Sequence, residues 1–98
     1  MRVAVIGGGI AGLAAAWELR GHAEVTVFEP GPLGGKLQTS EFAGRLVDEG
    51  ADAFLTRVPE ALDLCAELGL TDELVAPAAG GTLLWTGGRL RQLPDGLA

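Results

Sequence analysis

The sequence predicts an α/β fold in which a β-strand, a helix and a second strand are followed by β-hairpins and a short helix. Three observations carry this prediction. Short apolar runs rich in β-branched residues flank a segment whose apolar residues recur at helical spacing. Glycine makes up 16 of 98 residues and clusters between the apolar runs without forming a repeat. Prolines and paired glycines punctuate the rest of the chain, as expected of tight turns.

Two strands and one helix are predicted within the first 29 residues. The first strand is predicted over 2–6, where residues 3–6 are all apolar, as in a strand covered on both faces, and residues 24–29 form a second strand rich in β-branched side chains. Between them, residues 10–20 carry an apolar helical face, and Gly21 is expected to end the helix. A connection of this length suits parallel strands, so the three elements are predicted to form a βαβ unit.

Beyond residue 29, the sequence predicts a hairpin on either side of one helix. Two hairpins with two-residue loops are expected, with strands over 37–42 and 45–49 and over 83–86 and 89–93. A helix over 59–68 is expected to begin at Pro59 and to stop at Gly69, with a further short helical turn over 70–75.

Such a chain does not build a finished domain. Two parallel strands leave a sheet with an open edge and bare faces. We therefore expect residues 1–98 to be the N-terminal part of a larger domain that is truncated here. We also expect that the isolated chain self-associates through the open sheet edge.

Composition limits the classes of partner and the compartment. The net charge of −6 repels phosphate backbones, so nucleic acid is excluded as a partner. One cysteine and one histidine cannot form a Cys/His metal site, and no metal is expected. The single cysteine fits a reducing compartment, which predicts a cytoplasmic protein, peripheral to the membrane as part of a longer chain.

A glycine-rich turn follows the first strand and opens the helix. Its pattern is Gly7-x-Gly9-x-x-Gly12. The first glycine permits the tight turn, the second lets a pyrophosphate approach the backbone, and the third lets the helix pack closely. Free amides at the helix start then face the phosphates. The predicted dinucleotide contacts are Gly7, Gly8, Gly9, Ile10, Ala11 and Gly12.

An acidic residue ends the second strand, twenty residues past Gly9. At this position the carboxylate of Glu29 can accept hydrogen bonds from the 2′- and 3′-hydroxyls of a ribose, and it would repel a 2′-phosphate. The turn and this acid together predict an incomplete Rossmann-like, dinucleotide-binding domain. A simple NAD domain would continue with another helix, whereas this chain makes a Gly34-Gly35-Lys36 turn and enters a hairpin.

The segment after Glu29 resembles a known family. Glu29-Pro30 followed by LGGKLQT (33–39) is similar to the second dinucleotide-binding motif of the FAD-dependent amine oxidase superfamily. The resemblance implies an FAD cofactor that lies near Pro30, the backbone of Gly35 and the charge of Lys36.

Two further stretches are similar to one group of enzymes within this superfamily. EGADAFL (49–55) is similar to the E-x-G-[PA]-D-[SA]-F-L stretch of protoporphyrinogen and coproporphyrinogen oxidases, and GRLRQLPDGL (88–97) is similar to their G-x-L-x-x-L-P-x-G-L strand and turn. The resemblance implies that the flavin lies against Gly50, Ala51, Asp52 and Ala53. Asp52 also suits a structural role, in which it caps the following turn through its own backbone.

The resemblance implies a flavin oxidase of haem biosynthesis, which oxidises coproporphyrinogen III or protoporphyrinogen IX to the porphyrin with O₂. Residues 80–82 are uncharged where eukaryotic members carry an arginine, which favours a bacterial member and coproporphyrinogen III as its small-molecule substrate. No residue of this chain is assigned a catalytic role. The alternatives are another FAD-dependent amine oxidase, a carotenoid desaturase, or a non-catalytic fragment when the chain is isolated.

Overall fold

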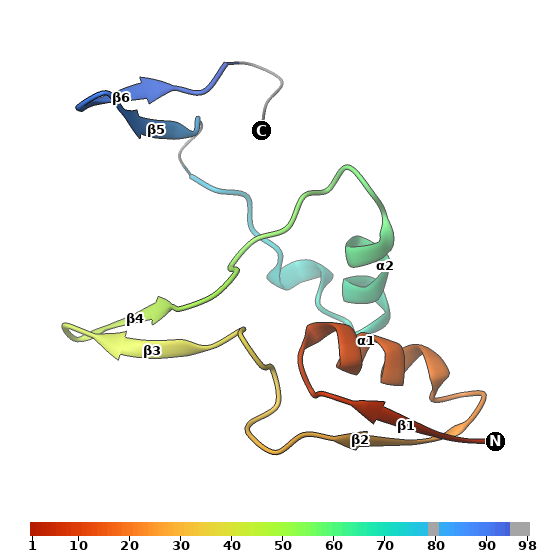
Figure 1. Cartoon of the computed structure of the whole chain (residues 1–98). Helices are drawn as coiled ribbons and strands as arrows, with labels where there is room; N and C mark the ends of the chain where they lie inside the picture. Colours follow the sequence, from red (N-terminus) through yellow and green to blue (C-terminus); the bar gives the residue numbers. More distant parts are fainter. Residues whose placement is uncertain (79–80, 95–98) are drawn as a thin grey trace. The chain divides into compact units, whose positions relative to one another are not determined.

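A computed structural model of the chain describes residues 1–78 and 81–94, and these residues form a mixed helix and strand fold. Two compact units are present, Met1–Leu55 and Thr56–Ala98, and each is described by itself. Figure 1 labels the elements in chain order.

The first unit begins with the predicted βαβ arrangement. Strand β1 (Arg2–Ile6) is followed by helix α1 (Ile10–Leu19) and strand β2 (Glu24–Phe28). The two strands pair in parallel, in a register that runs from Arg2 opposite Glu24 to Ile6 opposite Phe28. Figure 1 shows the strands side by side with α1 lying along them, and α1 contacts both strands. The predicted parallel crossover is confirmed.

One face of this strand pair is covered, and the other is bare. Val5 faces the helix, because a Cβ built on Gly12 of α1 would lie 3.3 Å from Val5 Cγ1. On the opposite face Ile6 is 81% exposed and Phe28 is 54% exposed. The apolar pattern of β1, which suits a strand covered on both faces, is therefore matched by cover on one face only, since a single crossover helix covers one face of the pair. The bare face agrees with the prediction that two parallel strands leave part of the sheet uncovered. Among the described residues, no hydrophobic side chain is fully buried.

Helix α1 ends differently from the prediction. It stops at Leu19, and Arg20 keeps a helical conformation. The N–H groups of His22 and Ala23 both donate to Leu19 O, at 2.9 and 3.0 Å. The helix therefore ends in a turn that closes on Leu19, and Gly21 is not among the left-handed residues.

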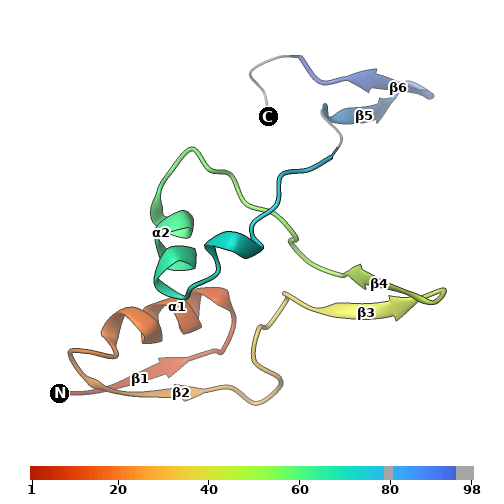
Figure 2. The ribbon, with the colours of Figure 1, turned by 180° about the vertical axis from the view of Figure 1, so that it is seen from behind.

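The first hairpin follows within the same unit. Strands β3 (Thr39–Phe42) and β4 (Arg45–Asp48) pair antiparallel, as the view from behind in Figure 2 shows. Their loop is Ala43-Gly44, and both residues have positive φ (51° and 76°), as a type I′ turn requires. At the open end Thr39 Oγ1 donates to Asp48 Oδ1 at 2.7 Å.

Strand β3 starts two residues later than predicted. The N–H of Leu37 donates to Gly34 O at 3.0 Å, and the side-chain amide of Gln38 donates to Gly35 O at 2.7 Å. The first bond holds Leu37 in the preceding turn. Gln38 makes one further cross-strand bond, in which its carbonyl oxygen accepts from Glu49 N–H at 2.8 Å, before the regular strand begins.

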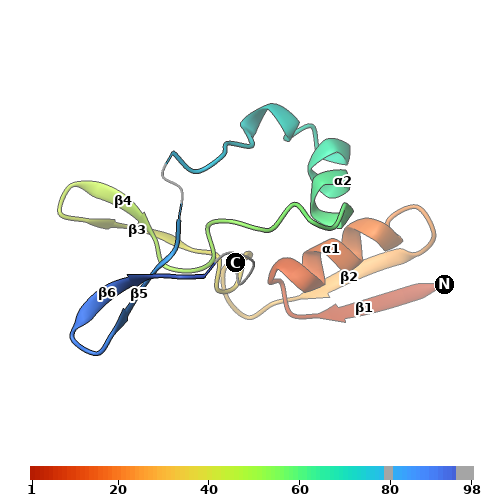
Figure 3. The same ribbon diagram turned by 90° about the horizontal axis from the view of Figure 1, so that it is seen from above.

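The second unit contains helix α2 (Glu60–Glu67), the short helix η1 (Thr71–Glu73) and a hairpin of β5 (Leu83–Thr86) and β6 (Arg89–Gln92). Figure 3 shows β5 and β6 as a ribbon closed by a tight loop. The predicted hairpin is confirmed, and both loop residues, Gly87 and Gly88, have positive φ. Residue 80 of the uncharged 80–82 segment and residues 95–97 of the stretch that resembles the family's strand and turn lie outside the described residues.

Helix α2 ends as predicted, at Gly69. Gly69 has a φ of 72°, its N–H donates to Ala66 O at 3.1 Å, and the N–H of Leu70 donates to Cys65 O at 2.8 Å. This pair of bonds is a Schellman motif. Pro59 lies one residue outside the helix, as its N-cap. No helix among the described residues is long and apolar enough to cross a membrane.

Candidate functional site

The glycine turn between β1 and α1 is held against the end of β2. Gly7 has a φ of 100°, and its N–H donates to Phe28 O at 2.8 Å. A Cβ on Gly12 would lie only 2.0 Å from Gly7 O. The first turn of α1 can therefore lie on the glycine turn only because residue 12 has no side chain.

The start of α1 presents unsatisfied amide donors. Gly9 is the N-cap and offers no side-chain acceptor, and the first bond of the helix runs from Leu13 N–H to Gly9 O at 2.9 Å. The N–H groups of Ile10, Ala11 and Gly12 precede that bond and have no acceptor within the helix. The first turn also contains no acidic side chain that would balance the positive end of the helix dipole.

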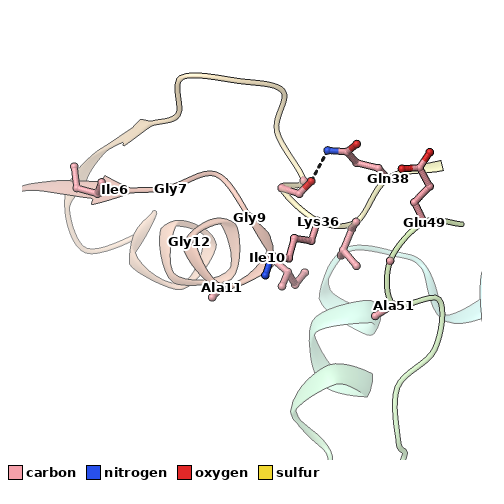
Figure 4. Close-up of a pocket in the computed structure, with 14 residues that line it drawn as sticks. Ile6, Gly7, Gly9, Ile10, Ala11, Gly12, Lys36, Gln38, Glu49 and Ala51 are labelled. Atoms are coloured by element: carbon pink, nitrogen blue, oxygen red, sulfur yellow. Dashed lines mark hydrogen bonds between the residues drawn. The ribbon is translucent and has the colours of Figure 1, made fainter. Parts of the chain in front are cut away.

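A cation lies beside this positive helix end. Figure 4 shows the Lys36 side chain pointing toward Ile10 at the start of α1. A lysine is unfavourable at a helix N-terminus unless an anion lies there as well. The backbone at Gly9 is open to such an anion, since nothing lies within 4 Å of the position of its absent Cβ. These donors suit a phosphate group.

Lys36 is held in place by backbone contacts between its own loop and the glycine turn. Gly34 N–H donates to Gly8 O at 2.8 Å, and Gly9 and Gly34 form a parallel β-bridge. A Cβ on Gly35 would lie 3.1 Å from Gly9 Cα. The 34–36 loop therefore runs in van der Waals contact with the glycine turn, and bulkier residues would separate the two.

A third segment closes on the same loop. A Cβ on Gly50 would lie 2.2 Å from Lys36 O, so the chain after β4 also approaches through a glycine. The N–H of Glu49 donates to Gln38 O at 2.8 Å, which aligns this segment with the end of the 34–38 turn.

These three segments surround an open cleft of about 880 Å³ (Figure 4). Nine of the predicted site residues line it: Gly7, Gly9, Ile10, Ala11, Gly12, Gly35, Lys36, Gly50 and Ala51. Five lining residues were not among those predicted: Ile6, Gly34, Leu37, Gln38 and Glu49. All five are sequence neighbours of predicted residues, so extending each motif by one or two positions would have found them.

Five predicted residues do not line the cleft: Gly8, Glu29, Pro30, Asp52 and Ala53. Gly8 is buried, whereas Pro30, Asp52 and Ala53 are exposed. Both roles considered for Asp52 stay predictions.

Glu29 lies behind the glycine turn, where backbone amides bind its carboxylate. Gly8 N–H donates to Oε2 at 2.7 Å, and Gly31 N–H donates to Oε1 at 3.0 Å. Both bonds stabilise the ionised form, so they lower the pKa of Glu29, and the Gly8 bond has the larger effect. Partial desolvation opposes the shift but does not reverse it.

The family described as flavin containing amine oxidoreductase matches residues 10–97, and this chain belongs to it. Membership implies a flavin cofactor.

Among known relatives, a coproporphyrinogen III oxidase of Propionibacterium freudenreichii subsp. freudenreichii is 46% identical over 96 residues, covering 95% of this chain and 18% of that protein. Another protein of that name, from Bacillus subtilis, is 37% identical over 102 residues, which cover 96% of this chain and 22% of that protein. The protein named protoporphyrinogen oxidase 2, chloroplastic/mitochondrial, of Arabidopsis thaliana is 44% identical over 78 residues, or 78% of this chain and 15% of that protein. The chain thus spans about a fifth of the length of these relatives.

Proposed function

We propose that this chain binds the ADP half of FAD, as the first part of an incomplete Rossmann-like FAD-binding domain. The observation that carries the proposal is the start of α1. Three amide donors, an N-cap without a side chain and the Lys36 ammonium converge there on an open cleft. The amide donors and the ammonium repel one another electrostatically, and an anion between them would remove that cost.

In this proposal the pyrophosphate lies against Gly9 and accepts hydrogen bonds from the amides of Ile10, Ala11 and Gly12. Lys36 supplies a positive charge from the second loop. The close backbone contacts of Gly12 with Gly7 and of Gly35 with Gly9 support the proposal, because they fix the donors before a ligand arrives.

The adenosine ribose lies on Glu29 in this proposal. An ionised carboxylate has about four acceptor sites, and the two backbone bonds of Glu29 use one on each oxygen. Each oxygen keeps acceptor capacity for one of the two vicinal hydroxyls. The same negative charge disfavours a 2′-phosphate, which supports FAD over an NADP-type ligand.

We further propose that the whole protein oxidises coproporphyrinogen III to the porphyrin, as relatives bearing that name suggest. Bound FAD would supply the hydride acceptor for each two-electron step, with a proton released from the macrocycle and O₂ reduced to H₂O₂. This chain's own residues bind and orient the ADP end. Gly50 and Ala51 line the cleft on the side contributed by the segment after β4, which supports placing the flavin end toward them.

Isothermal calorimetry of FAD with this chain tests the proposal. We expect weak, saturable binding that is lost in Glu29→Ala and retained in Glu24→Ala, a matched control that removes an exposed carboxylate from β2, the strand that Glu29 follows. Equal loss in both variants, or no binding by a chain that circular dichroism shows to be folded, would contradict the proposal. Turnover of the full-length protein with coproporphyrinogen III, but not with an amine or a carotene, would distinguish the proposed oxidase from the alternative flavoenzymes.

A further inference from the structure

The Gly8 peptide is held on both sides. Its N–H donates to Glu29 Oε2 at 2.7 Å, and its carbonyl oxygen accepts from Gly34 N–H at 2.8 Å. The other carboxylate oxygen of Glu29 accepts from Gly31 N–H at 3.0 Å. One side chain therefore connects the end of β2, the glycine turn and the loop that leads to Lys36.

Packing reinforces these hydrogen bonds. A Cβ on Gly8 would lie 3.0 Å from both Cβ and Cγ of Glu29 and 2.6 Å from Leu33 Cδ2. The stems of Glu29 and Leu33 thus lie directly over a buried backbone position, and the packing of the Glu29 stem on Gly8 places its carboxylate beside the glycine turn.

We propose that Glu29 is a positioning residue, which locks the glycine turn to the 31–34 loop before any dinucleotide binds. The effect of this locking on ligand binding rests on the proposed function, because the locked turn is the one that would bind the pyrophosphate. Direct contact with a ribose and this locking of the turn are separate roles, and only the second operates in the free protein.

The chemistry of the contact requires a carboxylate. Gly8 and Gly31 both donate, to different oxygens, so the side chain must accept at both of its terminal atoms. Glutamine has the same shape, but one terminal atom is an NH₂ group, which donates only. Glu29→Gln therefore leaves one of the two amides facing another donor.

Within the described part of the chain, the groups that hydrogen-bond this carboxylate are the backbone amides of Gly8 and Gly31. Neither the turn at 7–9 nor the loop at 30–35 contains a titratable side chain. The backbone bonds from Gly8 and Gly31 lower the pKa of Glu29. Titration of Glu29 should therefore report on those two amides directly.

NMR of the uniformly labelled 98-residue chain tests the inference without a ligand. We expect the Gly8 and Gly31 amides and the Glu29 carboxyl carbon to titrate together, with one midpoint below the ordinary glutamate value. In Glu29→Gln the shared titration should vanish, and the Gly8, Gly31 and Gly34 amides should shift. Glu24→Gln should leave all three amides unchanged.

Adding ADP to the same samples separates the inference from the proposed function. Coupled titration without ADP binding would support the positioning role and refute the proposed ligand. If the chemical shifts of the Gly8 and Gly31 amides do not change as Glu29 titrates, the positioning role is wrong, even if ADP binds. If Glu29→Gln unfolds the unit, the titration of the unaltered chain still decides the matter.

Discussion

Replacing Gly12 by alanine tests the packing that brings α1 onto the glycine turn. The new Cβ would lie 2.0 Å from Gly7 O, about 1 Å inside the 3.0 Å limit of such contacts, and 3.1 Å from Gly7 C, which is tight but tolerable. The obstructing atom is a backbone carbonyl, and its residue is tied to Phe28 by a 2.8 Å hydrogen bond. It cannot rotate away as the end of a side chain would.

Two opposing effects set the magnitude. Overpacking typically costs about 1–3 kcal/mol of stability. Because the obstructing atom is a fixed backbone atom, we expect Gly12→Ala to lose about 3 kcal/mol, the upper end of that range. Alanine is about 1 kcal/mol more favourable than glycine within a helix, which offsets part of that cost. The net loss is about 2 kcal/mol, or about a 30-fold increase in the equilibrium constant for opening of the βαβ unit.

Native-state hydrogen exchange measures this change directly. We expect the protected amides of β1 and β2 to exchange about 30-fold faster in Gly12→Ala. Gly21→Ala is the control, because nothing lies within 4 Å of its Cβ position and exchange should change less than about threefold. Unchanged protection in Gly12→Ala would refute the claim that close backbone approach at residue 12 shapes the site.

Other perturbations give distinct outcomes. In Gly50→Ala the new Cβ would lie 2.2 Å from Lys36 O. We expect this change to weaken FAD binding at least tenfold and to leave amide exchange in β1 and β2 unchanged. An unaltered affinity measured by calorimetry would contradict this expectation. Ala43→Asn should stabilise the β3–β4 hairpin by about 0.5–1 kcal/mol, because the φ of 51° suits asparagine better, and cross-strand NOE intensities would show the gain or its absence. Because the folded state lowers the pKa of Glu29, its stabilising contribution is present above the glutamate pKa of the unfolded chain and is lost as pH falls through the folded pKa. Acid titration by circular dichroism should show this loss in the unaltered chain and not in Glu29→Gln, whereas identical acid curves would disprove it.

Local patterns in the sequence were enough to predict the elements. The apolar runs gave both strands of the parallel pair, and the paired loop residues gave both hairpins, because turn chemistry is decided by neighbouring residues. Helix ends were harder to predict. Gly69 ends α2 in a Schellman motif with Leu70 after it, whereas Gly21 is followed by His22, and a polar residue cannot supply the apolar contact that accompanies the motif.

The candidate site was only partly predictable, because its geometry comes from contacts between distant segments. The motifs indicated Gly9, Gly35 and Gly50, but only the structure shows that the first two contact each other and that Gly50 contacts Lys36. Nothing in the sequence showed that the Glu29 carboxylate turns back onto Gly8, since that contact requires the strand pairing, the turn and the loop together.

Mapping FAD binding by NMR is the most direct test of the claim that the pyrophosphate binds at the glycine turn and the start of α1, because it locates the amides that the phosphates contact. We predict that FAD shifts the amides of Ile10, Ala11, Gly12 and Gly35, and that Lys36→Gln weakens FAD binding several-fold without changing the spectrum of the free chain away from residue 36. Amide shifts confined to the second unit, or an FAD affinity that Lys36→Gln does not change, would contradict the claim that the phosphates bind at the start of α1.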